Sequence, residues 1–242
     1  YFLDKQQDKF KLSLLSLVLL GIFFSPVAVG AQLHTGTAFL LDGSDKSKLG
    51  TDDGTIGIGK NSKAGYGAIA IGQYSKAKAR HNVAIGYKAD SGVQPNTITI
   101  GYNTKVSGQE AIAIGKESKA GKESVVLGGQ AKGTSTQTVA IGNLATASAS
   151  QSIAIGANTK AEGYGSISIG GDDLKTTKYQ TGNQGQSKTT TAKGKASVAI
   201  GGMSVAEGEG SIVLGPLASA SHTEGIAIGA RSKSTAEYGI AV

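Results

Sequence analysis

The sequence predicts an all-β solenoid, in which a short unit is stacked on itself about a dozen times. The first indication is the run Ile69-Ala70-Ile71-Gly72, which returns with small variations from residue 56 to the last residue. The second is the spacing, because the glycine that ends each copy follows the previous one by 13 to 15 residues, with one gap of 31. The third is the composition, since 37 glycines, 5% aromatic residues and no tryptophan do not suit a thick globular core. So short a period marks one supersecondary unit that contacts its neighbours in a stack.

Each unit is expected to hold two short strands joined by two tight bends. The third and fifth residues after the glycine are small, as in Ser75 and Ala77 after Gly72. Side chains alternate faces along a strand, so these two share one face, and Ile69 and Ile71 share a face of the preceding strand. A helix is disfavoured because the apolar period is two, the residues are β-branched and glycine recurs in every unit.

The packing predicted from this parity places each Ile/Val pair inward, against the small pair of the facing strand. Stacked units would hydrogen-bond in parallel register about 4.8 Å apart, as a rod roughly 60 Å long. The small residue between each Ile/Val pair would then point outward, where another chain could approach closely. We predict that this column is the oligomer contact, the alternative being that alanine simply drifts on a free surface. Its members are Ala70, Ala84, Ala113, Ala140, Ala154, Ala199 and Ala227.

Changes in unit length are expected in the bends, because strands keep a fixed length. The 13-residue units retain their small pair and lose a residue just after it. Within the 31-residue gap, Thr190, Ala192 and Gly194 match the second strand of a normal unit. The extra residues of this gap must therefore begin directly after Gly170, and we interpret residues 171–189 as a loop insertion.

The N-terminal segment differs from the repeats and is expected to be a signal peptide, residues 1–31. Three lysines precede an apolar run, residues 12–24, and small residues follow, which is typical of secretory signals cleaved here between Ala31 and Gln32. A transmembrane anchor is disfavoured because the apolar run is shorter than a bilayer requires. Since the first residue is Tyr1, the signal is expected to be incomplete at its start.

The remaining chain divides into two parts. Residues 32–55 are expected to form a strand and loop that cap the first unit, and residues 56–242 are the repeats. Cysteine is absent, so backbone ladders and stacking, without disulfides, must hold an exported product together. Val242 falls inside a repeat, which indicates that the natural chain continues.

Lysine recurs at the fourth residue after the glycine, between the two small residues expected to point inward. These side chains should therefore point outward and align along the rod. We interpret the column as a multivalent face for an anionic ligand. The alternative is a solvated face that keeps a long β surface from aggregating. The column consists of Lys63, Lys76, Lys105, Lys119, Lys132, Lys160 and Lys233.

No catalytic, metal or cofactor site is predicted, so we expect a protein that is not an enzyme and has no nucleic-acid partner. The three histidines are isolated, and the two adjacent Asp pairs should point to opposite faces, so acid/base catalysis and metal ligation are unsupported. No glycine stands between a strand and a helix, which disfavours a phosphate-binding loop. The residues considered are His34, His81, His222, Asp52, Asp53, Asp172 and Asp173.

The repeat Ala-Ile-Ala-Ile-Gly-x-x-Ser-x-Ala-x-Gly resembles the YadA-like head domain of trimeric autotransporter adhesins over residues 56–242. Ile153-Ala154-Ile155-Gly156, with Thr159, Ala161 and Gly163, shows the pattern fully, and residues 170–174 resemble the start of a loop insertion in such heads. The resemblance implies a left-handed parallel β-roll and a side-by-side homotrimer. It also implies export and display on a Gram-negative cell surface, through an outer-membrane anchor outside this chain.

The resemblance further implies binding of host extracellular matrix, of the collagen, fibronectin or laminin class, with attachment to host cells or autoagglutination. The sequence departs from the fullest pattern where Gly57, Thr99, Val126 and Ser168 replace the middle alanine, and it lacks coiled-coil heptads, neck and barrel strands. A second hypothesis is a structural spacer or self-association module of a surface fibre without a specific host ligand. A left-handed β-helix acyltransferase is disfavoured because its hexapeptide rhythm gives longer turns and no catalytic histidine is placed.

Overall fold

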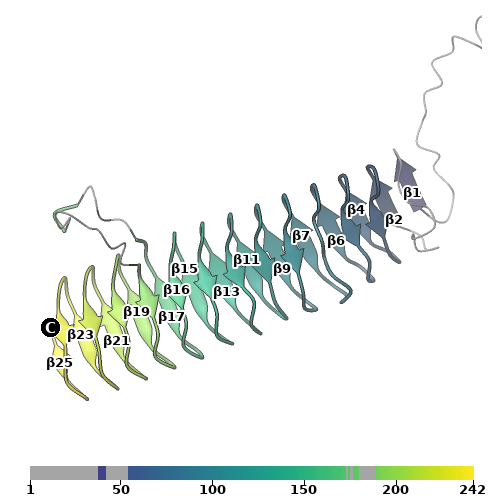
Figure 1. Cartoon of the computed structure of the whole chain (residues 1–242). Coiled ribbons are helices and arrows are strands. Elements are labelled where there is room, and N and C mark those ends of the chain that lie inside the picture. The colour runs from purple at the N-terminus through teal and green to yellow at the C-terminus, as the bar shows by residue number, and fades with distance from the viewer. Residues whose placement is uncertain (1–37, 42–53, 173, 175–176, 180–188) are drawn as a thin grey trace, which may run out of the picture. The chain divides into compact units, whose positions relative to one another are not determined.

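The structure is a computed structural model and describes residues 38–41, 54–172, 174, 177–179 and 189–242. The predicted signal peptide, its Ala31–Gln32 cleavage position and most of the predicted cap lie outside these residues. Within them the fold is all-β and contains no helix, and therefore no helix that could span a membrane. Parallel strands stack as a β-solenoid of about 12 turns spaced by about 14 residues, as predicted (Figure 1).

Most turns give one strand to each of two layers, which we call sheet A and sheet B; the turn of β6 gives sheet B only isolated bridges at Asp90. Sheet A has 14 strands in chain order, and each pairs in parallel with its equivalent in the next turn, for example Ile69 with Val83 and Ala70 with Ala84. Its strands are β1 (Ala38–Leu41), β2 (Thr55–Ile58), β4 (Ile69–Ile71), β6 (Val83–Ile85), β7 (Ile98–Ile100), β9 (Ile112–Ile114), β11 (Val125–Leu127), β13 (Val139–Ile141), β15 (Ile153–Ile155), β17 (Ile167–Ile169), β19 (Val198–Ile200), β21 (Ile212–Leu214), β23 (Ile226–Ile228) and β25 (Ile240–Ala241).

Sheet B is made of two-residue strands in two ladders. Isolated bridges from Lys76 to Asp90 and from Asp90 to Lys105 connect the ladders. The shorter ladder is β3 (Lys63–Ala64) and β5 (Lys76–Ala77). The longer ladder is β8 (Lys105–Val106), β10 (Lys119–Ala120), β12 (Lys132–Gly133), β14 (Thr146–Ala147), β16 (Lys160–Ala161), β18 (Thr191–Ala192), β20 (Val205–Ala206), β22 (Ser219–Ala220) and β24 (Lys233–Ser234).

Tight turns join the sheets on both sides. After β4 the Ser75 amide donates to the Gly72 carbonyl at 3.2 Å, and before it the Ala68 amide donates to the Gly65 carbonyl at 3.2 Å. The recurring glycine lets neighbouring turns stack this closely. At Gly115, where φ is +131°, an added Cβ would lie 2.3 Å from the Gly128 carbonyl oxygen. That position therefore requires glycine for both conformation and space.

The core between the sheets consists of small side chains. The predicted orientation of the sheet A side chains, with the Ile/Val pairs inward, is wrong. From β4 to β23 the middle residue of each sheet A strand points inward and is fully buried, whereas the aliphatic pair on either side points outward and is partly exposed. The predicted outward orientation of the alanine column is therefore incorrect. Ala70, Ala84, Ala113, Ala140, Ala154, Ala199 and Ala227 are each 0% exposed in the isolated chain, so none can contact another subunit.

The physical reason is the narrow gap between the sheets. Turns that close within three residues on each side hold the sheets too near to admit an isoleucine beside the Ser and Ala of sheet B. In the turn containing β4 the four inward residues are Ala68, Ala70, Ser75 and Ala77, all 0% exposed. The core thus packs small residues against small ones, and the bulky residues are displaced to the outer face of sheet A.

One turn shows how closely volume is matched across this gap. Val126 replaces the middle alanine and is 0% exposed, and the facing residue of sheet B is Gly133 instead of alanine. A Cβ added at Gly133 would lie 2.8 Å from Val126 Cγ2 and 2.5 Å from Thr138 Oγ1. The larger residue on one strand is therefore accommodated by the loss of a methyl group on the other.

Candidate functional site

The seven predicted lysines lie on the outer face of sheet B. The register places Lys63 beside Lys76, and Lys119 beside both Lys105 and Lys132. Lys63 and Lys76 are half-buried, and the other five are exposed. Lys160 and Lys233 occupy the same row but have Thr and Ser neighbours, Thr146 and Thr191 for Lys160 and Ser219 for Lys233.

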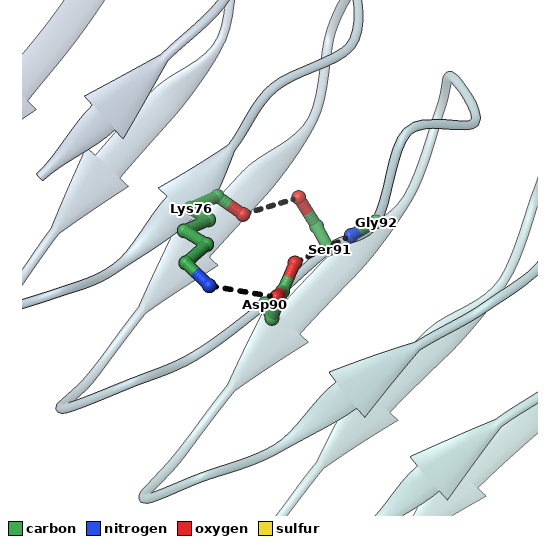
Figure 2. A network of polar contacts seen from close by, with 4 residues as sticks. All are labelled: Lys76, Asp90, Ser91 and Gly92. Atoms are coloured by element: carbon green, nitrogen blue, oxygen red, sulfur yellow. Dashed lines mark hydrogen bonds and ion pairs between the residues drawn. The ribbon is translucent and has the colours of Figure 1, made fainter.

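Asp90 interrupts this row, and sequence reasoning missed it. Figure 2 shows its contacts: Lys76 Nζ lies 3.4 Å from Asp90 Oδ2, and the Gly92 amide donates to Asp90 Oδ1 at 3.1 Å. Ser91 holds the same segment by donating its hydroxyl to the Lys76 carbonyl at 3.0 Å. The carboxylate therefore neutralises Lys76 and separates the first two lysines from the next three.

Lys105, Lys119 and Lys132 form an uninterrupted row of exposed ammonium groups. None of them has an ion-pair partner among the residues that the structure describes. Adjacent rungs are about 4.8 Å apart, and like charges directly opposite each other on neighbouring strands are destabilising. The fold does not demand them, because Thr191, Val205 and Ser219 occupy the row in later turns.

The charge of the solenoid is uneven along its length. Residues 54–147 carry eleven Lys and Arg against four Asp and Glu, a net charge of +7, whereas residues 148–242 carry eight against seven, a net charge of +1. In the second half, Lys193 Nζ lies 2.8 Å from Glu207 Oε1. The hydrogen bond to Glu207 is the main cause that raises the pKa of Lys193 above its usual value; burial lowers this pKa, and the charges of Glu207 and Glu162 raise it further. The net positive charge of the solenoid thus concentrates in its N-terminal half.

The outer face of sheet A is apolar along the described stack. Each turn presents two aliphatic side chains there, and the register aligns them into two continuous columns. Several are more than a third exposed, including Ile98 at 36%, Ile114 at 37% and Ile228 at 39%. Soluble monomers rarely expose a continuous apolar face of this extent, so this face marks an interaction surface.

Three tyrosines of consecutive turns form an exposed stack in the bends that follow the sheet A strands. The rings of Tyr87 and Tyr102 stack with centroids 5.5 Å apart, and Tyr74 meets Tyr87 edge-on at 6.1 Å. Lys88 Nζ lies 5.1 Å from the Tyr87 ring centroid. Sequence reasoning missed this stack because Tyr74 is the second residue after its glycine and the other two are the first. A usable signal was that three of the eight tyrosines fall in three successive units.

The insertion after β17 has described residues that contact later turns. Leu174 occupies the space beside Gly202, where a Cβ would lie 2.6 Å from Leu174 Cδ2. The Tyr179 ring lies 5.9 Å from the Arg231 guanidinium carbon. Thr190, at the return to sheet B, donates its hydroxyl to the Gly171 carbonyl at 2.9 Å.

The residues considered for catalysis are not brought together. His81 and His222 lie on different turns, with Asn96 and Ser221 as their polar neighbours. His34, Asp52, Asp53 and Asp173 lie outside the described residues. Among the residues described, no three His, Cys, Asp or Glu side chains form a group that could hold a metal ion.

Comparison with known families matches the YadA head domain repeat at residues 64–89, 95–118, 120–145, 134–159, 147–172, 192–218 and 220–242. These segments cover more than half of the chain. The chain belongs to the YadA head domain repeat family. YadA-like heads occur in surface-exposed trimeric autotransporter adhesins of Gram-negative bacteria, and the family is one of adhesins, not of enzymes. No curated protein matches the chain.

The YadA head repeats indicate a surface fibre like those of trimeric autotransporter adhesins. In the described part of the chain, the solenoid has one apolar outer face and one outer face that carries lysines.

Proposed function

We propose that this chain is the head of a surface adhesin, which assembles as a homotrimer through sheet A and binds host extracellular matrix through sheet B. The observation that carries the proposal is the two-sidedness of the solenoid. One outer face carries aligned Ile and Val side chains, and the opposite outer face carries aligned lysines. An apolar face is best covered by a second copy of itself, which leaves the charged face in solvent.

The trimer contact proposed here replaces the alanine column. Full burial of an Ile or Val side chain stabilises by about 1.5–3 kcal/mol, so covering one that is a third exposed contributes roughly 0.5–1 kcal/mol. Two such side chains occur on each of about 12 turns, and most are about a third exposed or less, so the gain is at most on the order of 10–20 kcal/mol per chain. That gain is comparable with the estimated cost of association, about 4–15 kcal/mol. Aligned columns also let three chains pack side by side without a change of register.

The ligand proposed for the outer face of sheet B is a host matrix protein of the collagen, fibronectin or laminin class. The candidate contacts are Lys63, Lys76, Lys105, Lys119, Lys132, Lys160 and Lys233. Identical side chains repeated along a stack favour a fibrous ligand with its own repeats, because linked contacts raise the effective concentration of each next one. Export by the N-terminal signal, cleavage after Ala31 and an outer-membrane anchor beyond this chain complete the proposal.

Two measurements test the proposal. Light scattering of the purified chain should give a trimer, and immobilised collagens, fibronectin and laminin should capture it at physiological salt. A monomer would contradict the proposed homotrimer. Failure to bind all three ligands and host cells would contradict the proposed matrix binding. Deletion of residues 102–156, which removes four turns, distinguishes an adhesin head from a structural spacer. An adhesin head loses affinity with these turns, whereas a spacer loses only reach.

A further inference from the structure

We propose that Lys105, Lys119 and Lys132, with Tyr102 in the bend that precedes β8, bind a linear sulfated polysaccharide that runs along the solenoid. This inference refines the ligand of the adhesin proposed above. It depends on that proposal in one respect, namely that assembly through sheet A leaves sheet B in solvent.

The charge pattern points to a polymer with regularly repeated anions. Lys105 and Lys132 are two rungs apart, so the Cα atoms of the three lysines span about 10 Å along the stack. None has an acidic partner in the described part of the chain, and their mutual repulsion is relieved when an anion lies across them. A sulfate ester keeps its charge at all physiological pH values and offers several acceptor oxygens to an ammonium group. Its repeated presence along a sugar chain matches three donors in a row.

The boundaries of the row support a defined site. At its N-terminal side, Asp90 already holds Lys76, and at its C-terminal side Thr146 takes the place of lysine. The site is therefore limited to three consecutive rungs, β8, β10 and β12. Residues flanking the lysines on this outer face are small and polar, such as Ser107 and Thr134, which leaves room for a bulky ligand along the strands.

The tyrosines decide between a sugar polymer and a nucleic acid. Binding of single-stranded nucleic acid uses a series of open aromatic faces on which successive bases stack. Here Tyr87 is flanked by Tyr74 and Tyr102, so its ring is not available to a base. Tyr102 is 50% exposed and has no ring or cation partner besides Tyr87 among the described residues, so it offers one open face. One open aromatic face, in the same turn as the first lysine of the row, suits a single sugar ring of a sulfated chain.

The test measures binding of the intact chain to heparin fragments, a sulfated polysaccharide, as a function of salt. With three contacts, counterion release predicts a roughly 20- to 40-fold loss of affinity between 50 and 200 mM salt. The variant Lys105→Ser/Lys119→Ser/Lys132→Ser should bind at least tenfold more weakly at low salt, with a salt slope flatter by about two to three. The matched variant Lys60→Ser/Lys78→Ser/Lys195→Ser removes the same charge from exposed lysines outside the row and should bind as the parent does. Equal losses in the two variants would overturn the site.

A second pair of variants tests the aromatic contribution. Tyr102→Ala should weaken heparin binding by about fivefold to tenfold without changing the salt slope, because a stacking contact releases no counterions. Tyr164→Ala, which removes another exposed tyrosine at 53% exposure, should have no effect. Circular dichroism and light scattering of all variants exclude unfolding or loss of assembly as the cause. An unchanged affinity in Tyr102→Ala would remove the tyrosine from the site.

Comparison ligands test the chemical class. Single-stranded DNA, polyglutamate, phosphatidylserine vesicles and hyaluronan, which carries only carboxylates, should each bind more weakly than heparin at equal charge concentration. Tighter binding of any of them would overturn the assignment to a sulfated polysaccharide. Failure to bind heparin, while collagen, fibronectin or laminin is still bound, would overturn this inference and leave the proposed function intact. If the chain binds heparin but attaches to no host matrix protein or host cell, the polysaccharide site is supported and the proposed matrix-binding function is contradicted.

Discussion

The matched volumes of Val126 and Gly133 give a quantitative test of the small-residue core. The expected free energies come from the contacts across the gap between the sheets. Val126→Ala removes two methyl groups from a fully buried side chain, which costs about 2 kcal/mol including the cavity that remains. Gly133→Ala adds a methyl group 2.8 Å from Val126 Cγ2, and such overpacking costs roughly 1–3 kcal/mol.

The double variant is expected to be more stable than the sum of the single changes predicts. With the valine shortened, the methyl group added by Gly133→Ala fills part of the cavity and contributes about 0.8 kcal/mol instead of clashing. The close contact with Thr138 Oγ1 remains, so recovery should be partial. We expect a favourable coupling energy of at least about 1 kcal/mol in the double-mutant cycle. Other turns carry alanine at both positions, as at Ala140 and Ala147, so the double variant reproduces an existing arrangement.

Amide hydrogen exchange is the suitable assay, because turns of a solenoid open locally and a single unfolding free energy is poorly defined for it. Protection in β11, β12 and β13 should fall in each single variant, whereas β21 and β23 serve as internal controls. Val213→Ala is the matched change, since Val213 is also 0% exposed but faces Ala220. It should lose protection around β21 as Val126→Ala does around β11. Additive effects within about 0.5 kcal/mol would refute the claim that these residues share one tightly filled space.

Three further predictions concern the glycine column, Asp90 and the apolar face. Gly115→Ala should destabilise by about 3 kcal/mol or more, because its Cβ would meet the Gly128 carbonyl, whereas Gly229→Ala, with φ +105° and open space, should cost only the backbone strain of about 1–2 kcal/mol. Thermal denaturation distinguishes them, and equal costs would contradict the steric argument. Asp90→Ser should change stability by less than about 1 kcal/mol, since its pair with Lys76 is partly exposed to solvent and therefore screened, and a drop of several kcal/mol in chemical denaturation would show a structural role instead. Ile114→Asp should dissociate the trimer while the strands persist, whereas Thr134→Asp on sheet B should leave it assembled; light scattering with circular dichroism measures both, and a trimer that survives Ile114→Asp would contradict assembly through sheet A.

Much of the fold could be predicted because its signals are local and repeated. The alternation of Ser75, Lys76 and Ala77 determines which residues of sheet B point inward, and the structure agrees at each of these positions. The parity of sheet A could not be settled in this way. A strand of three residues, such as Ile69–Ile71, has the same period whether its middle residue or its flanking pair faces inward. The choice depends on the gap between the sheets, which the turn hydrogen bonds at Gly65 and Gly72 determine and the sequence period does not.

The candidate surfaces were predictable to different degrees for the same reason. Counting from the glycine located the lysine row, because each lysine falls on a strand whose register with the next strand is regular. The tyrosine stack lies in the bends. There Tyr74, the second residue after its glycine, still contacts Tyr87, the first residue after its glycine. Asp90 lies at a lysine position, and only its ion pair with Lys76 shows that the row is divided there.

The small core also explains why the outer face of sheet A needs a partner. An alanine buries little apolar surface, so a turn built around Ala68, Ala70 and Ala77 gains little hydrophobic stabilisation from its own interior. Most of the apolar surface of such a turn belongs to Ile69 and Ile71, which the isolated chain leaves partly exposed. Anything that covers these residues in the folded state alone stabilises that state by mass action. Folding and assembly through sheet A are therefore expected to be coupled, while sheet B, whose outer residues gain nothing from burial, remains free to vary in charge along its length.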